Sequence, residues 1–336
     1  MSAKDIPYQL RPNKYIDRQL FLEFLSRCLP SFGVEKYVYI SMGGKHLVDQ
    51  NSVYRKVGLK ALCSFDGSEE IVKRQKANRL LDTTECLTLM SHELPSKLDQ
   101  ILDNCSSEVE RLIIWLDFTD PRERKGQLSE LVRLLLNLNP LDIVRITMNA
   151  NGHQLVPESK PDAWDKIADT PSKALAIMLN EQLGDDFYPA KYKDAVNYNE
   201  FSRVLVECIS LAVSHAELVN NGVKFVPTLI TEYKDGQRMV TVTLIACEAE
   251  KIDEALQPLL GWQFSASNWE DMHVIDAPDF SPREKLQIDQ VISKPVTEIL
   301  DGLQYCPARN AKAAEVAVEN YQKFHRYYPS FHTVEF

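Results

Sequence analysis

Short apolar runs that alternate with amphipathic segments are the feature that most constrains the fold of this chain. The run YVYIS at 37–41 predicts a strand, HLVDQNSVYRKVG at 46–58 predicts a helix that ends at Gly58, and KALCSF at 60–65 predicts a second strand. This β-α-β order fits within about 30 residues, the usual length of a right-handed parallel crossover. We therefore expect these two strands to be parallel neighbours.

The same alternation continues toward the middle of the chain. Apolar strands are expected at 111–116 and 142–151, with the amphipathic helix KGQLSELVRLLLNLN at 125–139 between them. A further helix at 15–30, which Pro30 should end, precedes the first strand. Strands that are continuously apolar are typical of parallel sheets covered on both faces. The sequence therefore predicts an α/β fold with a Rossmann-like, doubly wound and mostly parallel sheet.

The C-terminal half changes character. Residues 160–220 are mainly helical in pattern, and two β-rich runs within 224–247 are joined by Asp235 and Gly236, which predict an antiparallel hairpin. Because proline cannot donate to a central ladder, Pro227 predicts that the first run is an edge strand and that the second pairs on both sides. The expected organisation has three parts: an N-terminal helical segment at 1–35, a Rossmann-like domain at 36–250 with a helical insertion at about 155–220, and a helical extension at 251–336.

Composition narrows the classes of function. The 336 residues carry a formal net charge of -10, so the molecule as a whole would repel a nucleic-acid backbone. No apolar run approaches the roughly 20 residues that span a bilayer, and the first residues show no apolar signal region. The seven cysteines are scattered without a CxxC pair, which favours reduced thiols and no metal site. We expect a cytoplasmic protein that does not bind membranes. The net charge does not favour nucleic acid as a partner, although basic residues clustered in space could still bind it.

A glycine turn follows the first predicted strand and an acidic residue follows the second. In open α/β sheets the ligand lies beyond the carboxyl ends of the strands, where Ser41, Met42, Gly43 and Gly44 would let it approach the backbone. A carboxylate about 20 residues later can accept hydrogen bonds from ribose hydroxyls, and Asp66, followed by Gly67, has that position. These six residues form the predicted cofactor site, although Asp66 could equally cap the helix that follows.

The turn does not match a dinucleotide fingerprint. With Gly43 as the middle glycine of GxGxxG, Ser41 replaces the first glycine and His46 the third, so pyrophosphate binding is poorly supported. An adenosine cofactor that lacks a pyrophosphate fits better than NAD.

Asp117 and Asp120 follow the predicted strand at 111–116 and should face the same crevice. A carboxylate there could orient an acceptor hydroxyl, act as a base or bind a divalent cation, whereas Asp120 beside Pro121 could also begin a turn. We predict Asp117 and Asp120 as catalytic residues, without a metal.

Residues 36–250 resemble the class I S-adenosylmethionine-dependent methyltransferases, in which a parallel sheet ends in an antiparallel hairpin with the sixth strand at the edge and the seventh beside the fifth. More narrowly, RPNKYIDRQLFLEFL, YVYISMGG and DGSEEIVKRQKAN are similar to a bacterial family described as putative O-methyltransferases, often found among phage-defence genes. The resemblance implies S-adenosylmethionine as cofactor, bound by Gly43, Gly44 and Asp66, and an anti-phage role. It departs from the wider pattern at Tyr39, where an acidic residue is usual, and at Ser41 and Lys45, where glycines are usual.

Two other interpretations stay open. The chain could be a catalytically degenerate Rossmann-like subunit that senses a nucleotide or holds a protein partner in a defence complex, with the helices at 155–220 and 281–336 as its interaction surface. It could also be an NAD-dependent oxidoreductase. The sequence leaves the methyl acceptor open, both as a small molecule and as a protein.

Overall fold

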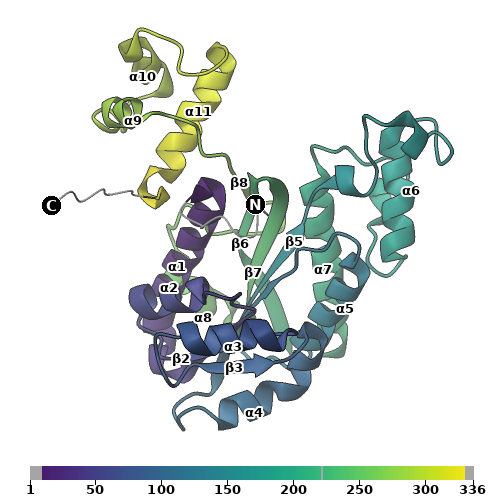
Figure 1. Ribbon diagram of the computed structural model, residues 1–336, viewed down its shortest axis with the longest axis vertical. Coiled ribbons are helices and arrows are strands. Elements are labelled where there is room, and N and C mark those ends of the chain that lie inside the picture. The colour runs from purple at the N-terminus through teal and green to yellow at the C-terminus, as the bar shows by residue number, and fades with distance from the viewer. Residues whose placement is uncertain (1–9, 221, 330–336) are drawn as a thin grey trace. The chain divides into compact units, whose positions relative to one another are not determined.

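The structure, a computed structural model, describes residues 10–220 and 222–329, and these contain one mixed eight-stranded sheet with helices (Figure 1). The strands lie in the order β3-β2-β1-β4-β5-β7-β6-β8. Their bounds are β1 Tyr37–Ser41, β2 Ala61–Asp66, β3 Glu85–Thr88, β4 Arg111–Asp117, β5 Ile143–Asn149, β6 Val223–Asp235, β7 Gln237–Glu248 and β8 Met272–Ile275.

Strand direction confirms the predicted fold class. β1 pairs in parallel with β2 and with β4, the pairs β2–β3 and β4–β5 are also parallel, and β7 joins β5 in the antiparallel sense. The chain thus adds β2 and β3 on one side of β1. It then crosses to the other side of β1, where β4 and β5 follow. The reversal between β1 and β4 is a topological switch point, where open α/β sheets bind ligands.

The helices between the strands are those that the alternation predicts, with additional ones in the C-terminal half. Their bounds are α1 Pro12–Phe32, α2 Val48–Val57, α3 Glu69–Asn78, α4 Leu98–Asp103, α5 Arg124–Leu135, α6 Pro171–Leu183, α7 Phe201–Val219, α8 Ile252–Leu256, α9 Pro282–Asp289, α10 Val296–Leu303 and α11 Ala311–Phe324.

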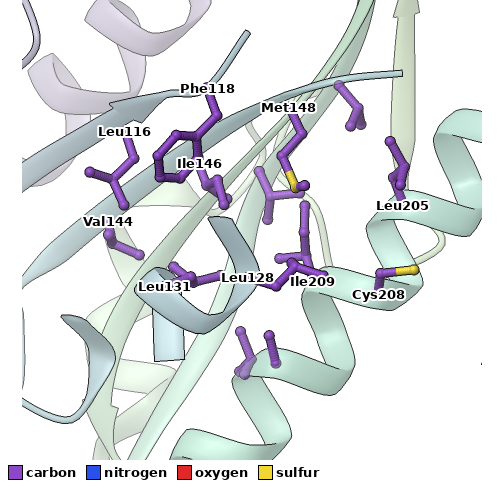
Figure 2. Close-up of a cluster of buried hydrophobic side chains, with 14 of the residues drawn as sticks. Leu116, Phe118, Leu128, Leu131, Val144, Ile146, Met148, Leu205, Cys208 and Ile209 are labelled. Atoms are coloured by element: carbon purple, nitrogen blue, oxygen red, sulfur yellow. The ribbon is translucent and has the colours of Figure 1, made fainter. Parts of the chain in front are cut away.

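One face of the sheet packs against α5 and α7. Figure 2 shows apolar side chains of β4 and β5 pointing toward Leu128 and Leu131 of α5 and toward Leu205 and Ile209 of α7. All four of these helical residues are fully buried. Since alternate strand residues point to one face, β4 and β5 each supply every second side chain to this core.

The opposite face of the same strands is also covered. Phe21 of α1 makes an edge contact with Trp115 of β4, with ring centroids 5.3 Å apart. The fully buried Arg145 of β5 lies 4.7 Å from the Phe21 ring and 4.8 Å from the Trp115 ring, and it donates a 2.7 Å hydrogen bond to the Thr243 hydroxyl. The prediction that the sheet is covered on both faces is thereby confirmed.

The C-terminal hairpin is partly as predicted. The seventh strand lies beside the fifth, but the prediction that the sixth is an edge strand is wrong, because β8 lies beyond it. β8 has four residues and β6 has thirteen, so β8 can pair with only part of β6.

Two other local expectations fail. β3 was not predicted, because the segment ECLT is too short to show periodicity. The N-terminal helix continues to Phe32, with Pro30 inside its last turn.

The chain forms two compact units. The larger comprises residues 21–232 and 237–273, and the smaller comprises residues 10–20, 233–236 and 274–329 within the described part of the chain. In the smaller unit, α9, α10 and α11 enclose a core that includes Ile288, Ile299 and Val318, and the Tyr321 hydroxyl donates a 2.9 Å hydrogen bond to Asp289. The domain limits at 35 and 250 stay predictions. No described helix is both long and apolar enough to cross a membrane.

Candidate functional site

The register of the parallel strands brings three predicted site residues to one edge of the sheet. Ser41 of β1 pairs with Ser64 of β2 on one side and with Trp115 of β4 on the other. Gly43, Asp66 and Asp117 each lie two residues beyond this level, on three adjacent strands. Neighbouring strands are about 4.8 Å apart, so these residues follow one another along the carboxyl edge at the switch point.

Glycine suits the two positions of the turn for different reasons. Both have left-handed φ angles, +62° at Gly43 and +53° at Gly44. A Cβ atom at Gly43 would lie 2.6 Å from Nε2 of Gln50 and 2.9 Å from Cδ2 of Leu47, whereas one at Gly44 would meet nothing within 4 Å. Gly43 therefore lets the turn pack on α2. Gly44 exposes backbone to open space that a ligand could fill.

Side-chain amides from α3 hold the turn from the other side. Nε2 of Gln75 donates to the Met42 carbonyl at 3.1 Å, and Oε1 of Gln75 accepts from the Ser64 hydroxyl at 2.9 Å. Asn78 donates to the Lys45 carbonyl at 2.7 Å. These bonds tie the turn to α3 and β2, which are elements of the predicted cofactor site.

Gln50 of α2 is a site residue that the sequence did not single out. Its side chain is fully buried, and its Nε2 lies 2.8 Å from the Ser41 hydroxyl and 3.5 Å from the Ser41 carbonyl. Its Oε1 is enclosed and has no hydrogen-bond partner among the described residues. Gln50 lies three positions before Val53 on the buried face of the helix, and a polar residue on an apolar stripe was the signal available in the sequence.

Asp66 ends β2 with a half-buried side chain. Its Oδ1 accepts a 2.8 Å hydrogen bond from the backbone N–H of Ser68, which forms a turn before α3. Ser68 itself holds the N-cap position of that helix, so the alternative in which Asp66 caps the helix is wrong. Its Oδ2 has no hydrogen-bond partner within the described part of the chain and can still accept one. At Gly67, an added Cβ would lie 2.3 Å from Sδ of Met90, so the Met90 thioether lies directly against this glycine.

The two predicted catalytic aspartates differ in their surroundings. Asp117 ends β4, is half-buried and lies level with Thr147 of β5. Asp120 accepts bonds from Arg122 through both carboxylate oxygens, at 3.0 Å and 2.6 Å. These bonds, with a backbone bond from Arg122, lower the pKa of Asp120 to about 2. A carboxylate with so low a pKa is a poor base, so its contacts support the turn that the sequence also allowed; its catalytic role stays a prediction.

A buried arginine holds the loop that follows β4. Arg124 at the start of α5 is fully buried and donates to the carbonyl of Pro121 at 2.8 Å, to the carbonyl of Asn149 at 3.0 Å and to Oε1 of Gln182 at 3.0 Å. Burial lowers the pKa of its guanidinium to about 10. One side chain therefore connects the loop after β4, the end of β5 and helix α6.

His153 lies beyond β5, and the sequence analysis did not single it out. It follows β5 in a short 3-10 turn, where the side chain of Asn151 accepts its backbone N–H at 3.2 Å. Its exposed imidazole stacks on Tyr198, with ring centroids 4.5 Å apart and an interplanar angle of 19°. An imidazole fixed in this way beyond the strand next to Asp117 can serve as a base.

The opposite, amino edge of the sheet has a cavity of about 910 Å³ lined by residues that include Arg111, Leu141 and Glu248. It is remote from the carboxyl edge, and none of the predicted site residues lines it. Among the residues that the structure describes, no group of three His, Cys, Asp or Glu side chains is placed to hold a metal ion.

Strand order, the open Gly44 and the carboxylates of Asp66 and Asp117 at one edge are the features that the sequence associated with a methyltransferase. The comparison of the chain with known families agrees, over residues 6–336. The chain belongs to the family described as "Putative O-methyltransferase". No curated protein matches it.

Solved structures similar to this chain are distant. The plantazolicin methyltransferase BpumL in complex with SAH is 10% identical, with 69% of this chain and 84% of that chain covered and a TM-score of 0.36. BamL, in complex with a desmethylPZN analog and SAH, is 12% identical, with 71% and 88% covered and a TM-score of 0.38. The N-methyltransferase NodS from Bradyrhizobium japonicum is 9% identical, with 69% and 96% covered and a TM-score of 0.34. The fold assignment therefore rests on this chain's own strand order and on the family.

Proposed function

We propose that this chain is an O-methyltransferase that uses S-adenosylmethionine. The observation that carries the proposal is that the turn after β1, with Gly43, and the ends of β2 and β4, with Asp66 and Asp117, meet at the switch point of the sheet. The open space at Gly44 and the available Oδ2 of Asp66 fit an adenosine cofactor whose ribose lies at β2. The family described as O-methyltransferases supports the same reaction.

The chain has three tasks in such a reaction: it binds both reactants, aligns them and accepts a proton. S-adenosylmethionine supplies a methyl group that its sulfonium has already activated. With both reactants bound, the acceptor oxygen would take the methyl carbon as the carbon–sulfur bond breaks, and the hydroxyl proton would then have to leave. In our assignment Asp117 orients the acceptor hydroxyl, and His153 accepts the proton.

Calorimetric titration with S-adenosylmethionine, S-adenosylhomocysteine and NAD tests the proposal. We expect saturable micromolar binding of the first two and none of NAD. Asp66→Ala should weaken binding by about 1–3 kcal/mol, because a ribose hydroxyl loses its charged acceptor. Asp120→Ala, at the exposed turn, is the matched control and should bind as the wild type does. If the wild-type protein binds neither methyl donor nor product, the proposal is wrong.

A second candidate is the degenerate subunit of a defence complex. The observation that favours it is the sequence of the turn, in which Tyr39, Ser41 and Lys45 stand where the wider methyltransferase pattern has an acidic residue and glycines. Such a subunit would bind neither S-adenosylmethionine nor S-adenosylhomocysteine and would co-purify with a protein partner. The calorimetric titration and a purification from the native host therefore separate the two candidates.

We also propose a cytoplasmic location and a role in anti-phage defence, both of which follow from the sequence and its resemblance. Deletion of the gene in its host should increase the efficiency of plaque formation by at least one phage. An Asp66→Ala protein should fail to restore resistance if defence depends on methyl transfer. Equal plaque counts with and without the gene across a broad phage panel would contradict the defence role and leave the enzymatic proposal intact.

A further inference from the structure

We propose that Gln50 contacts the cofactor directly: its Oε1 accepts a hydrogen bond from the α-ammonium of the amino acid part of S-adenosylmethionine. The inference rests on the proposed function and adds a specificity residue to the same site. It also accounts for a departure in the sequence, since the acidic residue usual at position 39 is Tyr39 here.

The orientation of the Gln50 amide follows from its neighbours. The atom that faces Ser41 lies 2.8 Å from the hydroxyl and 3.5 Å from the carbonyl oxygen of that residue. Because a carbonyl only accepts hydrogen bonds, the atom beside it is the donating Nε2. Oε1 is therefore the atom left to bond elsewhere.

That remaining atom is enclosed and has no donor among the described residues. A buried acceptor without a partner costs about 1–3 kcal/mol, and such groups in native proteins call for a structural or functional reason. Gln75, the other buried glutamine at the turn, has both amide atoms bonded, one to Met42 and one to Ser64. The contrast indicates that Gln75 serves only to hold the turn, whereas Gln50 lacks one hydrogen-bond partner.

The position of Gln50 in the site indicates which group of the cofactor would donate a hydrogen bond to its Oε1. The first glycine of the turn is close to it, since an added Cβ at Gly43 would lie 3.1 Å from its Oε1. A cofactor whose ribose binds Asp66 at β2 and whose methyl group faces Asp117 at β4 passes its amino acid part across the β1 turn. An atom that can only accept needs a donor, and the α-ammonium is the donor in that part of the cofactor; the carboxylate is excluded.

Access to Oε1 requires the turn to move. The turn covers the atom in the described conformation, but two consecutive glycines with φ angles of +62° and +53° can change conformation at low cost. The space beside Gly44 is open, so the turn has room to shift as the ligand enters. Binding would then supply the donor that the enclosed acceptor lacks.

The test compares two ligands that share the adenosine and thioether but differ in the amino acid part. S-adenosylhomocysteine carries the α-ammonium, and 5′-methylthioadenosine does not. For Gln50→Leu, which also removes the bonds of Nε2 to Ser41, we expect calorimetry to show a loss of affinity about tenfold or more greater for S-adenosylhomocysteine than for 5′-methylthioadenosine, equivalent to one charged hydrogen bond. Gln75→Leu is the matched control, because it loosens the turn and should weaken both ligands alike.

Gln50→Glu keeps the shape of the side chain and covers the case in which Gln50→Leu does not fold. A carboxylate beside the ammonium should raise the preference for S-adenosylhomocysteine over 5′-methylthioadenosine above that of the wild type. An unchanged ratio of the two affinities in either variant would overturn the inference while leaving the proposed function standing. Failure of the wild-type protein to bind either ligand would instead overturn the proposed function itself.

Discussion

At the scale of single residues, adjacent positions with the same backbone conformation have different roles. Gly43 and Gly44 both have positive φ angles, but only Gly43 is packed against the side chains of Gln50 and Leu47. Gly43 therefore stabilises the turn, and Gly44 leaves the turn accessible to a ligand. A similar division separates Asp66, which keeps one oxygen available, from Asp120, whose oxygens are taken by Arg122.

Alanine at each glycine should reveal this difference. Gly43→Ala should lower the free energy of unfolding by about 2–4 kcal/mol, since it combines a left-handed φ with a clash against the side chains of α2. Gly44→Ala should lower the free energy of unfolding by only about 1–2 kcal/mol, because the left-handed φ is its sole cost. Its main effect should be weaker binding of S-adenosylhomocysteine. Urea unfolding followed by calorimetry checks both, and equal losses of stability would contradict the packing role of Gly43.

At the scale of elements, the carboxyl edge is held by side chains that cross from one loop to another. Arg124 of α5 joins the loop after β4 to the end of β5 and to Gln182 of α6, and Gln182 itself donates to the carbonyls of Pro121 and Arg122. The α6 insertion is therefore connected directly to the loop beside Asp117. A change in α6 can therefore reach the loop after β4 through hydrogen bonds.

Arg124→Met should destabilise the protein by about 2–4 kcal/mol, because it leaves buried carbonyl oxygens without donors. Arg124→Lys should recover only part of this loss, since one ammonium cannot reach three acceptors in different directions. Arg122→Ala, two residues away on the surface, should change stability little. Chemical unfolding of the three variants provides the comparison. If Arg124→Met left the free energy of unfolding unchanged, the loops would be held by packing alone.

At the scale of the whole molecule, the cysteines report on the integrity of the core. All seven are free; Cys306 is exposed, Cys105 is half-buried and the other five are buried. Burial raises the pKa of Cys28 to about 12 and that of Cys247 to about 11, so these thiols are also poorly ionised. Both effects suppress their reactivity in the folded state.

A thiol reagent should therefore distinguish the native protein from the unfolded one. We expect Cys306 to react fast at neutral pH, Cys105 slowly, and the buried thiols only as the protein unfolds, with all seven reacting in denaturant. A Cys306→Ser protein, which should lose the fast phase alone, is the control. Rapid reaction of four or more native thiols would show that the apolar core opens readily.

The sequence by itself determined the α/β class, the parallel pairing of β1 with β2 and the position of the predicted site residues at the carboxyl ends of their strands. These follow from local signals: continuous apolar runs, glycine after the first strand and acids after the second and fourth. The role of α2 in the site was not accessible in this way, because Gln50 reaches the turn only when the helix packs back on β1.

Only the tertiary structure decided which polar atoms are satisfied and which strand lies at the edge. Pro227 predicted an edge strand, but β8, some forty residues later, lies beyond β6 and forms that edge. The His153 ring is held by stacking on Tyr198, which is distant in the sequence. Periodicity reports which face of an element is apolar, whereas hydrogen bonds and ring contacts between remote segments depend on how those faces meet.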